Sequence, residues 1–276
     1  YWTNIGPTPG YYFDYGNISG RVVTIKIDPV NTNTIYIGAA YGGVWKSTNG
    51  GLNWTPKTDF EVTLSSGALA IDPVNTNIIY YGTGEATYSG ASYSGRGLLK
   101  STNGGNNWTN YKTGLPTSSY FSRIVIKPGN SNYLLAAIGT SGLVRSTDAG
   151  VTWTTAVSGR CDDVVFSPDG TKVYIIGSGS GYKISTNGGT TFVAGTFPVA
   201  MGTRNHIAIC KAQPTVLYAA VYTGGTIKVY KSTNSGTSFA QISTATNFEG
   251  GQAWYDFYMH VSPLNANVAF VGSIDV

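Results

Sequence analysis

One eight-residue pattern occurs five times along the chain and constrains its fold more than any other feature. The copies begin at residues 47, 101, 146, 185 and 232, so successive copies start 39 to 54 residues apart. The first copy, Ser47–Trp54, reads STNGGLNW. The others keep the Ser-Thr start, Asn or Asp at the third position, Gly at the fifth and an aromatic residue at the eighth. Self-similarity at this spacing indicates a repeat architecture.

A second pattern precedes each octet and divides every repeat into four segments. An apolar run ends in a turn, as at Asp28-Pro29, and an Asn-rich turn then leads to a second run such as Ile35–Gly38. A third run, Gly43–Ser47, leads into the octet, whose aromatic residue begins the fourth segment. Short apolar runs bounded by turn residues predict strands, and four strands in about 40 to 50 residues make a propeller blade.

The repeats therefore predict an all-β fold, a β-propeller of four-stranded antiparallel blades with five complete repeats and a partial sixth. We expect six to seven or more blades in the full protein. The sixth repeat stops before its third strand, so truncation at the C-terminus is expected. Residues 1–7 resemble the segment after an octet and would supply an outer strand. As the alternative to truncation, this strand would complete a blade whose other strands come from the C-terminus and so close the ring. One propeller domain is expected over residues 1–276, with blades at roughly 20–58, 65–112, 120–156, 160–195, 204–243 and 256–276.

The third position of each octet has a structural interpretation. Asn and Asp side chains accept hydrogen bonds from nearby backbone amides, and the following Gly adopts positive φ without strain. The aromatic residue at the eighth position would then pack into the blade. We expect the octets to hold the hairpin between the third and fourth strands through Asn49, Asn103, Asp148, Asn187 and Asn234.

The pattern Ser-x-Asp/Asn-x-Gly-x-Thr/Ser-Trp/Phe resembles the Asp-box (BNR) repeat over nearly the whole chain. That repeat occurs in sialidases, xyloglucanase-type glycoside hydrolases, sortilin-like receptors and photosystem-assembly propellers. The resemblance implies a propeller fold, which does not by itself determine function. In Asp-box enzymes the site lies on the face opposite the octets. The resemblance to repeats of large exported bacterial proteins, which extends to Gly250–Asp256, implies a secreted or cell-surface location and further domains in the same protein.

Aromatic side chains are frequent in the segments expected on the face opposite the octets. Exposed rings bind sugar rings by stacking or capture peptides, although single rings can instead plug a junction between blades. Phe60, Phe121 and Phe257 belong to this aromatic set. We expect a surface for a glycan or a protein partner there, with the ligand-binding residues Tyr41, Tyr88, Tyr93, Arg96, Tyr120, Trp254 and Tyr255.

Seven carboxylates fall in the same segments, and we expect most of them to be solvated surface groups. They are Asp59, Glu61, Glu85, Asp162, Asp163, Glu249 and Asp256. Hydrolysis of a glycoside requires two carboxyl groups at a defined separation. The candidate catalytic residues are Asp256, which follows two aromatic residues at the entry to an inner strand, and Glu85.

Two enzyme families of the Asp-box group can be compared with this chain residue by residue. Sialidases usually carry an Arg-Ile-Pro string, which is absent here, so sialidase activity is not expected. Xyloglucanase-type enzymes place one catalytic Asp in a turn that matches Ala39–Gly43, and this chain has Ala40 at that position. Their second catalytic Asp follows a Trp, loosely as in Trp254–Asp256. The missing carboxylate argues against this activity unless Glu85 substitutes for it.

Composition limits the remaining partners. The net charge of +4 comes from scattered residues, which does not favour a nucleic-acid partner. The chain has no stretch of 18 apolar residues, so insertion into a membrane is not expected. His206 and His260 are isolated, so no metal or cofactor is expected, and His260 would be a hydrogen-bonded core residue. Cys161 and Cys210 are expected roughly 20 Å apart, beyond disulfide reach, as buried free thiols.

The sequence thus favours a non-catalytic, secreted or cell-surface propeller that binds a glycan or a protein through the face opposite the octets. Two alternatives stay open. One is a glycoside hydrolase, a xyloglucanase-like endo-glucanase, and the other is a structural component of a surface layer or filament.

Overall fold

The computed structural model describes residues 10–12, 16–18, 21–87, 89–90, 92–243 and 252–273. Their regular secondary structure is almost entirely β-strand, with one four-residue helix, α1 (Ala253–Asp256), among them. A short hairpin of β1 (Gly10–Tyr12) and β2 (Gly16–Ile18) comes first. No helix in the described ranges is long enough to cross a membrane. The outer strand expected at residues 1–7 lies outside the described residues.

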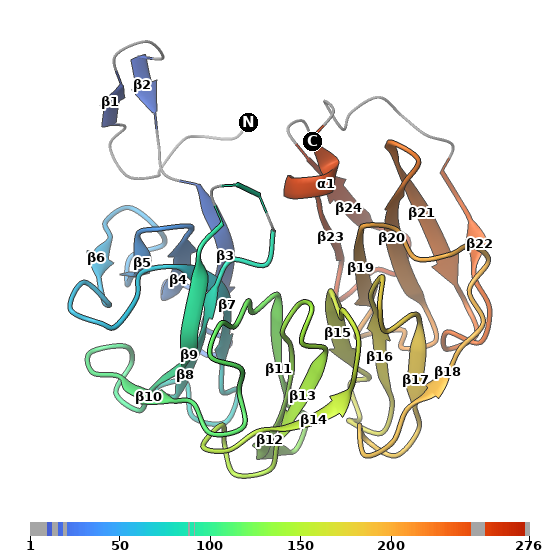
Figure 1. Cartoon of the computed structure of the whole chain (residues 1–276), viewed down its shortest axis with the longest axis horizontal. Coiled ribbons are helices and arrows are strands. Elements are labelled where there is room, and N and C mark those ends of the chain that lie inside the picture. The colour runs from blue at the N-terminus through green and yellow to red at the C-terminus, as the bar shows by residue number, and fades with distance from the viewer. Residues whose placement is uncertain are drawn as a thin grey trace.

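Five four-stranded antiparallel sheets follow one another as the blades of a propeller, which confirms the predicted fold class (Figure 1). Within each blade the strands pair in chain order, from the innermost to the outermost. Blade 1 contains β3 (Val22–Ile27), β4 (Ile35–Ala39), β5 (Gly43–Ser47) and β6 (Thr55–Pro56). Blade 2 contains β7 (Ser66–Ile71), β8 (Ile79–Gly84), β9 (Ser94–Ser101) and β10 (Thr109–Tyr111).

The other three blades repeat this order. Blade 3 contains β11 (Arg123–Lys127), β12 (Asn130–Ala137), β13 (Leu143–Ser146) and β14 (Thr154–Val157). Blade 4 contains β15 (Asp163–Phe166), β16 (Val173–Ile176), β17 (Lys183–Ser185) and β18 (Val193–Ala194). Blade 5 contains β19 (Arg204–Ile209), β20 (Leu217–Thr223), β21 (Thr226–Ser232) and β22 (Ala240–Gln241). A pair of strands, β23 (Tyr258–Val261) and β24 (Ala269–Gly272), follows as part of a sixth blade.

The innermost strands lie next to one another around a central axis. β3, β7, β11, β15, β19 and β23 contact one another in that order, so β3 and β23 stand at the two ends of an arc (Figure 1). The apolar core is distributed over the junctions between consecutive blades, because the side chains of each sheet face pack against the next blade. On β3, Ile25 is 58% exposed, whereas its counterpart in blade 2, Leu69, packs against blade 1 and is 1% exposed.

The octets have the same hydrogen bonds in all five blades. In blade 3, Ser146 Oγ accepts from the amide of Gly150 at 2.8 Å and donates to Asp148 Oδ1 at 2.7 Å. The amide of Thr152 donates to the same Asp148 oxygen at 2.9 Å. Gly150 has a φ of 84°, a conformation that strains other residues. The octet side chains therefore replace the backbone bonds that a tight hairpin loop lacks.

The octets also join neighbouring blades. Tyr36 Oη and Lys46 Nζ of blade 1 each donate a 3.1 Å hydrogen bond to the carbonyl oxygen of Gly104, in the octet of blade 2. Lys100 Nζ makes the corresponding bond to Ala149 O at 2.9 Å, and Tyr182 Oη bonds to Gly236 O at 2.9 Å. Each of these hydrogen bonds connects a Tyr or Lys side chain of one blade to the octet of the next blade.

Two aromatic residues that the sequence placed with the ligand face instead plug blade junctions. Phe121 is fully buried, and a Cβ atom on Gly82 would lie 2.4 Å from its ring, so only Gly leaves room for it. Phe257 is 2% exposed because it packs in the cluster between blades 5 and 6. Apolar rings at these positions gain more from burial than from exposure.

The predictions for His260 and for the two cysteines have opposite outcomes. The prediction for His260 is wrong: its side chain is exposed on β23 and makes no hydrogen bond to any described residue. At the end of the arc, no further sheet in the described ranges covers this face of β23. The prediction for the cysteines is confirmed, since Cys161 and Cys210 are both free and buried.

Candidate functional site

We call the end of the blades that carries the octets the octet face, and the opposite end the loop face. The loop face is formed by the connections between the second and third strands of each blade and by the connections between blades.

Two exposed tyrosines from neighbouring blades lie against each other on the loop face. Tyr41 is in the turn between β4 and β5, and Tyr93 directly precedes β9. Their ring centroids are 4.5 Å apart with an interplanar angle of 41°. Tyr41 is 61% exposed and Tyr93 is 55% exposed, so the pair presents aromatic surface to solvent.

A second aromatic pair lies at the other end of the arc. Trp254 and Tyr255 belong to α1, with ring centroids 5.5 Å apart, and Trp254 is 45% exposed. The guanidinium carbon of Arg21, which directly precedes β3, lies 4.8 Å from the centroid of the Tyr255 ring. This cation–π contact connects blade 1 with the partial sixth blade.

Arg21 also holds a buried carboxylate. Its Nη2 atom lies 2.6 Å and 2.7 Å from the two carboxylate oxygens of Glu85, whose side chain is 2% exposed. The amide of Glu85 donates to the carbonyl oxygen of Tyr93 at 3.2 Å. A continuous row therefore runs from Tyr41 and Tyr93 through Glu85 and Arg21 to Tyr255 and Trp254. We call these six residues the aromatic row.

A second charged group lies beside the row, at blades 4 and 5. Asp162 is 7% exposed and accepts from Arg160 Nε at 2.6 Å and from Asn205 Nδ2 at 2.6 Å. Arg204 Nη1 donates to Ala86 O at 3.4 Å, while its Nε atom is buried and has no partner among the described residues. Burial and the charge of Arg160 lower the pKa of Arg204, while Asp162, Glu85 and Asp256 oppose that shift.

A third ion pair lies deeper along the axis. Asp163 accepts from Arg123 Nε at 2.8 Å, contacts His206 Nδ1 at 3.2 Å and accepts the amide of Val164 at 2.8 Å. Burial disfavours the charge on Asp163, but Arg123 and His206 outweigh it and hold the pKa of the carboxyl well below its usual range.

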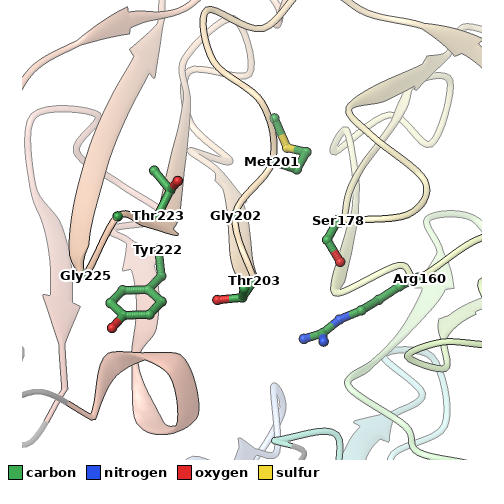
Figure 2. A pocket seen from close by; sticks show the side chains of 9 residues that line it. Arg160, Ser178, Met201, Gly202, Thr203, Tyr222, Thr223 and Gly225 are labelled. Carbon is green, nitrogen blue, oxygen red and sulfur yellow. The ribbon is translucent and has the colours of Figure 1, made fainter.

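A shallow hollow of about 390 Å³ opens between blades 4 and 5 (Figure 2). Arg160 and Ser178 lie on one side of it and Tyr222 on the other, with Thr203 between them. Because Asp162 holds Arg160, the guanidinium has a fixed position at the edge of the hollow. This place has no counterpart among the site residues predicted from the sequence.

The carboxylates differ from the sequence prediction. Glu85, Asp162 and Asp163 are buried and ion-paired rather than solvated, because each lies beside an arginine that begins or precedes an inner strand. Asp256 is half-buried at the end of α1 and accepts from Ser273 Oγ at 2.8 Å. Asp59 is exposed, burial raises the pKa of Glu61, and Glu249 lies outside the described residues.

The other predicted ligand-binding residues are less closely grouped. Arg96 is exposed on β9 and Tyr120 is half-buried before β11. Tyr88 lies outside the described residues. The sequence did not single out Arg21, Arg160 and Arg204 as site residues, although a signal was present. Each lies seven residues before the residue at which the first apolar run of its repeat ends in a turn, and Tyr255 occupies the same position in the sixth repeat. Within the described ranges no group of His, Cys, Asp and Glu side chains could hold a metal ion.

Comparison with known proteins identifies the fold. No family model matches the chain, and no curated protein matches its sequence. An ancestral GH74 enzyme shares 25% identity over 100% of this chain, with a TM-score of 0.73. The GH74 enzyme of Niastella koreensis shares 22% identity over 91% of this chain, with a TM-score of 0.72. The GH74 xyloglucanase of Xanthomonas campestris shares 16% identity over 92%, with a TM-score of 0.59.

These similarities support the propeller architecture and place this chain beside glycoside hydrolase propellers. The chain spans only 43%, 36% and 51% of the Niastella, ancestral and Xanthomonas proteins, respectively. At such low identity a common fold does not carry an activity with it.

Proposed function

We propose that the loop face binds a polysaccharide along the aromatic row without hydrolysing it, in a secreted or cell-surface protein. The observation that carries this proposal is the pair of exposed aromatic groups, Tyr41 with Tyr93 and Trp254 with Tyr255, on either side of the Arg21–Glu85 ion pair. Sugar rings stack on exposed aromatic faces, and fixed charged groups between the rings accept or donate hydrogen bonds to sugar hydroxyls.

The polar groups in the row and next to it favour binding over turnover. Both carboxylate oxygens of Glu85 are engaged by Arg21, and the Glu85 side chain is only 2% exposed. Asp256 accepts a hydrogen bond from Ser273, and Ala40 occupies the position of the first carboxylate of xyloglucanase-type enzymes. Two carboxyl groups free to act as acid and as base or nucleophile are therefore not apparent in the row.

Glycoside hydrolysis is the second candidate, and two observations favour it. The similar solved structures are GH74 enzymes. The negative charges of Glu85 and Asp256 both raise the pKa of Arg204 and so oppose the effect of its burial.

Binding and turnover can be measured separately with soluble xyloglucan as the probe, alongside mannan and chitin oligosaccharides. We expect saturable binding by calorimetry to at least one of them, and a loss of roughly tenfold or more in affinity for Trp254→Ala and for Tyr93→Ala, because each removes a stacking surface. The control is Leu52→Ala, which removes an exposed apolar side chain from the octet face.

The turnover assay measures new reducing ends on the same polysaccharides. We expect none from the unmodified chain and unchanged affinity in Asp256→Asn. Reducing ends that disappear in Asp256→Asn would establish the hydrolase instead. Failure to bind any glycan, with the fold intact, would overturn the proposal in favour of a protein partner or a structural role.

A further inference from the structure

The hollow between blades 4 and 5 is formed by connections of the loop face that contribute nothing to the aromatic row (Figure 2). Arg160 comes from the connection between blades 3 and 4, and Ser178 from the turn between β16 and β17. Thr203 directly precedes β19, and Tyr222 lies near the end of β20. Binding sites for small ligands have volumes of roughly 300 to 1,000 Å³. At about 390 Å³ the hollow is large enough for a small ligand.

One buried side chain, Asn205, holds separate parts of this lining in place. Its Nδ2 atom donates to Asp162 Oδ2 at 2.6 Å and to Gly202 O at 2.9 Å. Its Oδ1 atom accepts from the amide of Gly202 at 3.0 Å, and the residue is 0% exposed. Asp162 in turn accepts from Arg160 Nε at 2.6 Å. A continuous set of hydrogen bonds therefore connects Gly202 in the lining with Arg160 at its edge, so the hollow is formed before any ligand arrives.

The backbone of Arg160 is held as firmly as its side chain. Its carbonyl oxygen accepts from the amide of Gly179 at 3.1 Å and from the amide of Ser180 at 2.9 Å, both in the turn after β16. From this anchored position the guanidinium points into the hollow (Figure 2). A ligand that binds there does not have to order the arginine first, which lowers the entropic cost of binding.

The groups around the hollow fit a sugar that carries a carboxylate. A guanidinium offers a planar fork of N–H donors that matches the two oxygens of a carboxylate, and such charge-assisted hydrogen bonds are stronger than neutral ones. The hydroxyl groups of Ser178 and Thr203 are donors and acceptors for sugar hydroxyls. Tyr222 and Met201 add apolar surface for the face of a sugar ring.

We propose that the hollow binds a uronic acid residue of the polysaccharide that lies along the aromatic row, an inference that rests on the proposed function. One short segment separates the two places. Thr203 lines the hollow, and the next residue, Arg204, donates through Nη1 to Ala86 O at 3.4 Å. Ala86 directly follows Glu85 of the row. A polysaccharide that extends beyond the row at this segment therefore places its next sugar in the hollow.

The test uses the full chain and two forms of one ligand. One form is an oligogalacturonate, and the other is the same oligosaccharide after its carboxyl groups have been reduced to primary alcohols. Calorimetry measures the Kd of each. We expect the charged form to bind at least about tenfold more tightly, because reduction removes the charge-assisted hydrogen bonds to Arg160. Arg160→Gln should bind the two forms with equal affinity.

A second pair of variants leaves Arg160 and its partner Asp162 in place. Gly224 lines the hollow, and a Cβ atom there would meet nothing within 4 Å. Its φ of 60° lies in the left-handed region, which Asn and Asp tolerate better than other residues. Gly224→Asp puts a negative charge at the hollow, and Gly224→Asn is its uncharged control of the same shape. The charged ligand should bind Gly224→Asp at least about fivefold more weakly than Gly224→Asn.

Trp254→Ala separates this inference from the proposed function, because it removes a stacking surface of the row and should weaken both forms of the ligand equally. Equal affinity for the two forms in the unmodified chain would overturn the uronic acid site. So would a preference for the charged form that persists in Arg160→Gln and in Gly224→Asp, and neither result would affect binding along the row. A preference that disappears in Arg160→Gln while Trp254→Ala has no effect would support the hollow and overturn the row.

Discussion

Tyr182 and Gly236 are joined across a blade junction: the phenol of Tyr182 donates a 2.9 Å hydrogen bond to the carbonyl oxygen of Gly236, in the octet of blade 5. Tyr182 is 4% exposed, and its ring packs on Phe197 and Phe239. The octet is therefore both a loop within one blade and an acceptor for the preceding blade, which explains why the repeated loop stabilises the ring as well as each hairpin.

Replacing Tyr182 with Phe should lower the free energy of unfolding by about 1 kcal/mol, because the buried carbonyl of Gly236 loses its donor. Urea denaturation measures the change. Tyr230→Phe is a matched control, since Tyr230 is 1% exposed, packs on the same Phe197, and its hydroxyl has no partner among the described residues. That variant should be neutral or slightly more stable. Equal losses in both variants would mean that the Tyr182 hydrogen bond does not contribute.

Ser146→Ala should cost about 1 to 2 kcal/mol, because it removes the acceptor of the buried Gly150 amide. Asp148→Asn should change stability by less than about 0.5 kcal/mol, since the other four octets carry Asn at that position with the same acceptor geometry. Thermal or urea unfolding of the two variants side by side decides the point. A larger loss in Asp148→Asn than in Ser146→Ala would contradict this account of the octet.

Asp163 should make the fold sensitive to acid. Its pKa in the folded chain is depressed below the unfolded value of about 3.9, so its contribution to stability is present above that value and is lost as the pH falls toward the folded pKa. Asp163→Asn should lose about 3 kcal/mol at pH 7, because Arg123 and His206 are left without the buried carboxylate, and should flatten the dependence of stability on pH below 4.

Unfolding of Asp163→Asn and of Asp59→Asn as a function of pH measures this effect. Asp59 is exposed, so its replacement should leave both the stability at pH 7 and the acid slope nearly unchanged. An acid slope that persists in Asp163→Asn would assign the effect to other carboxylates.

The fold could be predicted from the sequence because the octet is a local signal: Ser146, Asp148 and Gly150 make their bonds to one another within five residues. The contacts between blades could not be predicted in the same way. Tyr36 and Gly104 are 68 residues apart, and their contact depends on how the blades are placed around the axis. The same limit explains the buried carboxylates, since Glu85 and its partner Arg21 are 64 residues apart.

The candidate site was predicted only in part for a related reason. Exposed rings such as Tyr41, Tyr93 and Trp254 could be selected by residue type and by loop position. Phe121 and Phe257 met the same criteria, but packing at a blade junction, with Gly82 leaving space for the ring of Phe121, buries them. The arginines could have been found only by aligning their positions relative to the turn of each repeat.

Hydrogen exchange on the full chain, with and without a saturating xyloglucan oligosaccharide, tests most directly whether the loop face is the binding surface. Backbone amides exchange more slowly where a ligand covers them or stabilises their hydrogen bonds. The proposal predicts slower exchange in residues 40–43, 85–95 and 252–257, and no change in the octets at 47–54, 101–108 and 146–153. Slower exchange confined to the octets, or no change anywhere at saturation, would contradict it.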